Sequence, residues 1–266
     1  MSRGPTGEKA ETQSRADAFT LVELLVTIGV IALLAALVFP ALSRGKAASR
    51  GAQCTNNHHQ LVLAWGLYCD EHHGLVPSLT NWVAGDMSKT HEATNALLLV
   101  DPQRSPFARY IPNPAIYKCP EDRSLHVRSV SMNNRLNPNA RYWIVGGGSR
   151  YEVFLSAQQI RVPAQIYVTT DERSETINDT AFCVDMSNTG NLEGVGADSP
   201  YWMIDYPGCY HDRADRFSFV DGHVESHRWL EPTTLVAAGQ AEAVTHTSGT
   251  DRDVQWLQEH CTYAKQ

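Results

Sequence analysis

One stretch limits how this chain can fold more than any other: residues 24–43 contain no charged side chain and are almost entirely apolar. A helix of twenty residues is about 30 Å long, which matches the hydrocarbon thickness of a bilayer. A secretory signal has a shorter apolar core, followed by a small-residue cleavage site. Here the small residue Ala18 precedes the apolar run, so cleavage there would leave the run on the mature protein. We therefore expect a membrane-spanning helix.

The residues that open this run carry a family resemblance. Residues 19–25 read Phe-Thr-Leu-Val-Glu-Leu-Leu, which resembles the N-terminus of type IV prepilins and type II secretion pseudopilins. The resemblance implies that a prepilin peptidase cleaves between Ala18 and Phe19, and that the new amine is methylated. Ala18 stands where these families usually have glycine. Glu23 and Pro40 fall where pilins carry a glutamate and a helix-kinking proline.

Glu23 needs a partner if it lies at bilayer depth. A carboxylate there costs about 2.5–3.5 kcal/mol on insertion scales. In a helical fibre of identical subunits, the positive amine of Phe19 on a neighbouring copy is the natural partner, and this charge pair would set the axial register of assembly. The alternative is that Glu23 sits at the membrane surface and extends to water.

The chain divides into four parts on this interpretation. Residues 1–18 are a polar leader, residues 19–43 are the transmembrane and assembly helix, residues 44–73 continue that helix in amphipathic form, and residues 74–266 form an exported globular domain. Leu61, Trp65 and Tyr68 recur at helical spacing and predict an apolar stripe that covers a sheet. The expected fold class is α+β and pilin-like, with a long N-terminal helix packed on an antiparallel β-sheet.

Strand-like runs follow in the globular domain. They occupy residues 142–145, 165–170, 181–184, 216–220 and 223–229, and a short helix is expected near residues 233–243. Asp221-Gly222 lies between the last two runs and predicts a hairpin with a two-residue type I′ turn. This register pairs Phe219 with Val224 and places both residues on the buried face with Phe217.

The same hairpin carries a second resemblance. His211, followed after nine residues by Asp221-Gly222, resembles the C-terminal signature of a large pseudopilin-like group from Planctomycetes and Verrucomicrobia relatives. Residues 53–57, 117–122 and 129–133 also resemble that group. The resemblance implies an envelope fibre or a component of a secretion apparatus.

Six cysteines occur without any Cys-x-x-Cys pair, which argues against a zinc ribbon or a thioredoxin-type redox pair. An exported domain lies in an oxidising space where disulfides persist. Cys54 with Cys119 is the expected disulfide, because the helix and residues 117–120 are expected to pack together; buried free thiols are the alternative. The net charge of −7 gives no support for nucleic-acid binding.

Metal sites find limited support in the sequence. His223 and His227 would lie about 13 Å apart along a strand, too far to bind one ion. Calcium prefers carboxylate and carbonyl oxygens, and four acids share one polar segment: Asp171, Glu172, Glu175 and Asp179. They are weak calcium candidates, with a solvated acidic loop as the alternative, and no other cofactor is expected.

No nucleophile, zinc-protease or phosphate-loop motif is present, so the chain is not expected to be an enzyme. The sequence favours a structural subunit of a pilus or type II secretion pseudopilus. Its expected place is the bacterial inner membrane, in a single pass, with the globular domain in the periplasm or at the cell surface. The expected partners are the prepilin peptidase and identical or related subunits.

Two alternatives differ from this interpretation. One is a monomeric, membrane-anchored binding module that holds a glycan or another ligand. The other is a membrane-tethered hydrolase, which would bring His211, Asp221 and another histidine around one cleft.

Overall fold

The structure is a computed structural model that describes residues 20–80, 82–138, 150–186, 201–237, 239–241, 245–247 and 250–266. The chain forms two compact units, Met1–Lys46 and Ala47–Gln266. The predicted leader, including Ala18 and Phe19, and the predicted strand at residues 142–145 lie outside the described residues.

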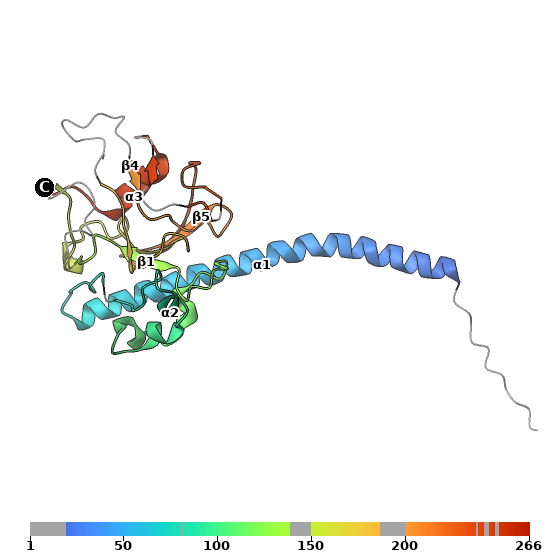
Figure 1. Cartoon of the computed structure of the whole chain (residues 1–266), viewed down its shortest axis with the longest axis horizontal. Coiled ribbons are helices and arrows are strands. Elements are labelled where there is room, and N and C mark those ends of the chain that lie inside the picture. The colour runs from blue at the N-terminus through green and yellow to red at the C-terminus, as the bar shows by residue number, and fades with distance from the viewer. Residues whose placement is uncertain are drawn as a thin grey trace, which may run out of the picture. The chain divides into compact units, whose positions relative to one another are not determined.

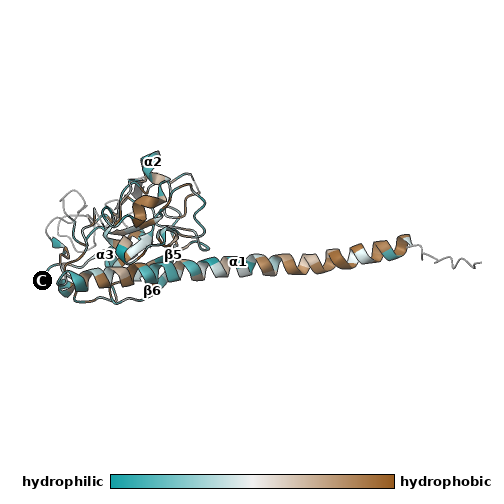
Figure 2. Ribbon diagram, turned by 90° about the horizontal axis from the view of Figure 1, so that it is seen from below, coloured by the Kyte–Doolittle hydropathy of each residue, from teal (hydrophilic) through white to brown (hydrophobic). Residues whose placement is uncertain are grey.

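The long helix predicted from the sequence is confirmed as α1, Leu21–Glu71, which continues through Pro40. It is followed by His73 and Gly74 with positive φ angles of 57° and 85°, and the Gly74 N–H donates to the Cys69 carbonyl. Figure 2 shows that α1 is mostly hydrophobic near its start and mixed in polarity further along.

The remaining elements belong to the second unit and include short helical turns and two sheets (Figure 1). In chain order they are α2 Thr90–Ala93, η1 Ala96–Val100, η2 Pro106–Arg109, η3 Pro114–Tyr117, β1 Val130–Asn133, η6 Ala157–Gln159, β2 Tyr167–Asp171, β3 Ala181–Phe182, β4 Tyr201–Met203, β5 Ala214–Phe219, β6 Val224–Arg228, β7 Thr245–Thr247 and α3 Arg252–Cys261.

The larger sheet has five strands in the order β3-β1-β2-β5-β6, and β4 pairs with β7 in a separate two-stranded sheet. With its long helix, this sheet gives the α+β, pilin-like fold expected from the sequence. The sheet is mixed and not purely antiparallel, because β3 runs parallel to β1. After β2 the chain crosses to the other side of β1 and forms β3 there. β3 is therefore antiparallel to β2 in direction and parallel to β1, its hydrogen-bonded neighbour.

The hairpin between β5 and β6 exists, but its predicted register was wrong by one residue. Ser218 pairs with Val224, and the Phe219 N–H donates to the His223 carbonyl. Gly222 has φ 94°, and its N–H donates to the Phe219 carbonyl. This is a three-residue loop with a type I turn and a left-handed glycine, instead of a two-residue type I′ turn. Val224 therefore faces away from Phe217 and Phe219.

Both faces of the larger sheet are covered. On one face, buried side chains of α1, Leu61 and Trp65 among them, pack against Met132 and Val168 of the sheet. On the other face, Phe217 and its neighbours pack against Leu257 of α3. Most of the buried apolar stripe predicted on α1 is confirmed, with Tyr68 only partly buried.

The helix expected near residues 233–243 was wrong, because none of the described residues in that range is helical. The C-terminal helix is α3 instead. Asp251 caps it by accepting from the backbone N–H groups of Asp253 and Val254, and Val254, Leu257 and Cys261 recur along its buried side.

Candidate functional site

The start of α1 is a capping box built from Thr20 and Glu23. The Thr20 hydroxyl accepts from the Glu23 N–H at 3.2 Å, while the Glu23 carboxylate accepts from the Thr20 N–H at 2.9 Å and from its hydroxyl at 2.7 Å. Such a reciprocal pair satisfies two backbone donors that a helix start leaves free. Within one subunit, therefore, Glu23 already has a partner, Thr20.

Sequence reasoning assigned Glu23 to assembly and missed this local role. The signal was present, since Thr-x-x-Glu before an apolar run is the pattern of a capping box. The role of Glu23 between subunits and the kink at Pro40 stay predictions.

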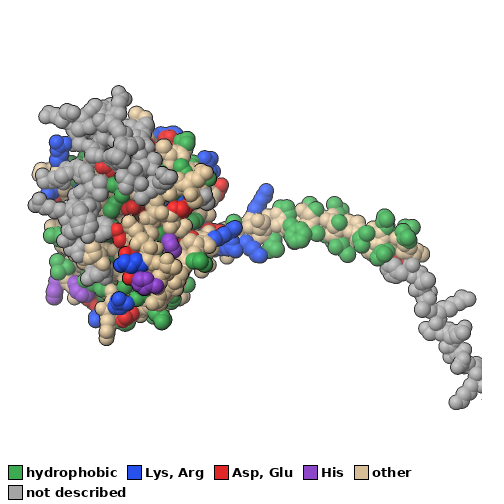
Figure 3. Space-filling view, in the orientation of Figure 1, with side chains coloured by type: hydrophobic (Ala, Val, Ile, Leu, Met, Phe, Trp, Pro, Cys, Tyr) green, Lys and Arg blue, Asp and Glu red, His purple; other side chains and the backbone are tan. Residues whose placement is uncertain are grey.

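The first turns of α1 present an apolar surface with nothing packed on it. Fourteen large hydrophobic side chains between Leu21 and Leu42 are more than half exposed, and Figure 3 shows such side chains along the visible face of this part of the helix. Among the described residues, α1 is the one helix long and apolar enough to cross a membrane. Large exposed apolar surfaces of this kind mark sites of contact with a membrane or with another protein.

A second group of side chains lies in the other unit, where the buried stripe of α1 becomes polar. Cys54 and His58 of α1 both contact Asp171 of β2: Cys54 Sγ and His58 Nε2 each lie 3.1 Å from Oδ2. His58 Nδ1 also lies 3.0 Å from the Thr169 hydroxyl. The Ser129 hydroxyl donates to the other oxygen of Asp171 at 2.5 Å. All five residues are buried.

A bulge in β2 decides that Asp171 faces α1. Tyr167 pairs with Phe219 and Thr169 with Ser218, so Val168 is an extra residue between two regular pairs. A bulge places neighbouring residues on the same face and reverses the alternation that follows. Burial alone would raise the pKa of Asp171, but the hydrogen bond and charge of His58, with Ser129 and Cys54, bring that pKa below its usual value.

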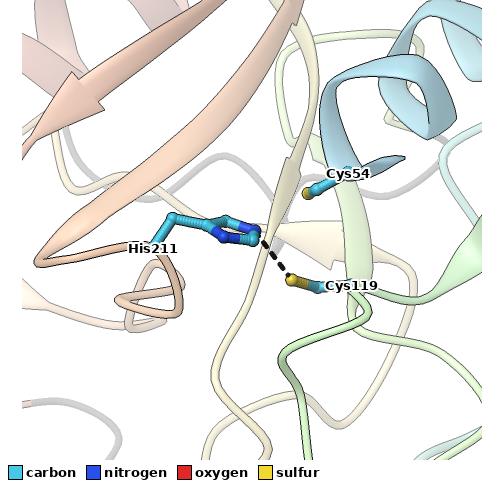
Figure 4. Close-up of side chains that lie close together, drawn as sticks. All are labelled: Cys54, Cys119 and His211. Carbon is cyan, nitrogen blue, oxygen red and sulfur yellow. Dashed lines mark hydrogen bonds between the residues drawn. The ribbon is translucent and has the colours of Figure 1, made fainter. Parts of the chain in front are cut away.

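Cys54 also meets Cys119 and His211. The three ligand atoms lie within 4.8 Å of one another, and Cys119 Sγ is 3.2 Å from His211 Nε2. Figure 4 shows the imidazole of His211 and the two thiols pointing into one space from three different segments. Both cysteines are buried free thiols, so the predicted proximity is observed while the predicted disulfide stays a prediction.

Local contacts hold each of these side chains in place. The Asn57 amide of α1 donates to the carbonyls of Ala115 and Lys118, next to Cys119. His211 precedes a tight turn whose central residues, Asp212 and Arg213, have φ angles of 53° and 63°. Burial and the charge of Arg216 lower the pKa of His211, which favours a neutral imidazole.

The residues of the sequence signature, His211 and Asp221, have different partners. The Asp221 carboxylate contacts the His223 ring, with Oδ1 and Nδ1 2.6 Å apart. His211 instead contacts the two thiols. These contacts do not form the cleft around His211 and Asp221 that a hydrolase would need. Gly222 forms the hairpin turn described above.

Each calcium candidate has protein partners of its own. Beyond Asp171, the Glu172 carboxylate accepts from Ser131. Glu175 accepts from Arg173 and from a backbone N–H, and Asp179 accepts from the Ala181 N–H. Calcium binding by these acids stays a prediction.

Comparison with known proteins adds one match. Residues 13–39 match the family model described as the prokaryotic N-terminal methylation motif. No curated protein and no solved structure matches the chain. The motif covers the capping box and most of the exposed apolar run, and it supports a protein that resembles type IV pilins or pseudopilins.

Proposed function

We propose that this chain is a structural subunit of a pilus or type II secretion pseudopilus. A prepilin peptidase cleaves it before Phe19, its apolar helix crosses the inner membrane once, and identical or related subunits assemble by packing these helices together. The globular unit then lies in the periplasm or on the cell surface. The observation that carries the proposal is the exposed apolar surface of α1 within an N-terminal methylation motif.

The driving force is the exchange of lipid contacts for helix contacts. Lipid tails are as apolar as leucine, so packing and polar contacts between helices decide association. A positive amine at Phe19 of one subunit would pair with the Glu23 carboxylate of its neighbour. Glu23 then has two candidate partners, the Thr20 cap of its own helix and the amine of another subunit.

Three substitutions separate these two roles. Glu23→Gln keeps an oxygen that can accept from the Thr20 N–H, because glutamine also serves in capping boxes, but it removes the charge. Thr20→Val keeps the charge and removes the capping hydroxyl, at a cost of about 1 kcal/mol of helix stability. Glu23→Ala removes both functions.

We expect Glu23→Gln and Glu23→Ala to reduce incorporation into fibres by roughly 10–100-fold, since a hydrogen bond to a charged group is worth about 1.5–3 kcal/mol. Thr20→Val should assemble nearly as wild type. The measurement is the fraction of subunit in sheared or cross-linked fibres, with the N-terminal mass of membrane-bound protein as the control for cleavage. Wild-type assembly of Glu23→Gln, or an uncleaved leader on native protein, contradicts the proposal and favours a monomeric anchored binding module.

A further inference from the structure

We propose that Cys54, Cys119 and His211 bind a zinc ion, beside the carboxylate of Asp171, which contacts Cys54. The inference concerns the unit Ala47–Gln266 and does not depend on fibre assembly. It rests on the convergence of two thiols and one imidazole from α1, the segment after η3 and the turn before β5 (Figure 4).

The distances between the three side chains are close to those of a zinc site. Zinc binds cysteine sulfur at about 2.3 Å and histidine nitrogen at about 2.0–2.1 Å, which puts neighbouring ligand atoms of a tetrahedron about 3.5–3.8 Å apart. Here the three ligand atoms lie within 4.8 Å of one another, and Cys119 Sγ already lies 3.2 Å from His211 Nε2.

The kinds of donor also select the metal. Two thiolates and one imidazole are soft or intermediate ligands, and they favour zinc over calcium or magnesium, which prefer oxygen. Zinc binding converts two thiols into thiolates and releases two protons to the solvent, so the charges of the ion and the thiolates cancel. No oxidant or reductant takes part.

Asp171 supports the same assignment. Its Oδ2 lies 3.1 Å from Cys54 Sγ, and its carboxylate is itself held by His58 and Ser129. Buried polar partners of this kind orient the ligands of metal sites.

A disulfide explains less of this arrangement than an ion does. A bond between Cys54 and Cys119 would use two of the groups and leave the His211 imidazole facing a sulfur that has no proton to share. An ion uses all three ligands.

His211 also connects the cluster with the surface. It is half-buried, and a pocket lined by Ala47, Gly51, Thr55, Tyr210, His211 and Arg216 opens beside it. An ion can reach the ligands by this route. Once bound, it would join three segments that are far apart in the sequence, as structural zinc ions do.

The test uses the full chain, purified in detergent with a thiol reductant and without chelator. We expect about one zinc per chain by elemental mass spectrometry, and a thiolate-to-cobalt charge-transfer band when Co²⁺ replaces zinc. Removing zinc with a strong chelator should lower the melting temperature by about 5 °C or more, because a ligand that binds only the folded state stabilises it.

Variants locate the site. Cys54→Ser, Cys119→Ser and His211→Ala should each weaken zinc binding by about 100-fold or more, and Asp171→Asn by about 10–100-fold. Cys69→Ser is the matched control: Cys69 is also a buried thiol on α1 but lies outside the cluster, so this variant should bind zinc as wild type does.

Three results would overturn the proposal. The first is a wild-type chain that contains no zinc and takes up none from added Zn²⁺ under reducing conditions. The second is a Cys54–Cys119 linked peptide as the main species in native protein. The third is equal loss of zinc from Cys69→Ser and Cys54→Ser. The first two results are obtained with the wild-type chain, so they test the zinc proposal even if a variant does not fold.

Discussion

His227 of β6 shows how a single residue gives the fold a dependence on pH. Its ring stacks on Trp256 of α3, with ring centroids 3.8 Å apart, and its buried Nε2 makes no hydrogen bond. Burial, with a smaller contribution from His260, lowers the pKa of His227 to about 4. Between about pH 6.5 and pH 4, His227 is therefore protonated in the unfolded chain and neutral in the folded chain. The free energy of unfolding falls as the pH drops through this range.

His227→Phe should remove this contribution and keep the ring stacked on Trp256. We expect the loss of unfolding free energy between pH 7 and pH 4 to shrink by roughly 1–3 kcal/mol. Denaturant unfolding at a series of pH values measures it. His91→Gln, at an exposed histidine, should leave the profile as in wild type; a profile that His227→Phe does not change would contradict the assignment.

At the scale of elements, the hairpin turn between β5 and β6 depends on one glycine. Gly222 has φ 94°, a conformation that side chains with a Cβ rarely adopt. Gly222→Ala should therefore destabilise the unit by about 1–2 kcal/mol.

Gly66 provides the opposite case. It lies inside α1, and an added Cβ would meet nothing within 4 Å. Gly66→Ala should stabilise by about 0.5–1 kcal/mol, because alanine loses less backbone freedom in a helix. Denaturant unfolding measures both changes. If the two substitutions change the free energy of unfolding equally, backbone conformation does not explain their effects.

Elements with strong local patterns were predicted well, and those with competing patterns were not. α1 follows from its composition and periodicity. α3 was missed although Asp251 is a good cap, because polar residues in its short sequence conceal the spacing of Val254, Leu257 and Cys261. The hairpin register failed because Asp-Gly suits both two-residue and three-residue loops. In the observed register His223 stacks on Phe219 and His227 on Trp256, and Val224 faces the other way.

At the scale of the whole molecule, acids from distant segments gather inside the globular unit. Asp205 is buried and accepts from the Cys183 N–H at 2.6 Å. Burial and the charge of Asp179 raise the pKa of Asp205 to about 7. The folded chain then retains a proton that the unfolded chain releases, so this group reduces stability as the pH rises from about 4 to 7.

Asp205→Asn should abolish that decline, since asparagine keeps an oxygen that can accept from Cys183. We expect the variant to be more stable than wild type by roughly 1–4 kcal/mol above pH 7, and by little below pH 4. Melting temperatures across this range provide the measurement. Asp70→Asn, which removes an exposed acid from α1, is the control; an advantage of Asp205→Asn that is the same at all pH values would contradict this origin.

The sequence by itself determined the apolar start of α1, the cap at Thr20 and Glu23, and the presence of a helix and strands, because each depends on residues close together in the chain. Only the tertiary structure decided that His211 joins Cys54 and Cys119, and that Asp171 lies beside Cys54. Which residues meet depends on strand register and on the bulge at Val168, which reverses the face of every residue after it in β2. Packing across the sheet determines the register and the bulge, and neither can be predicted from a local sequence pattern.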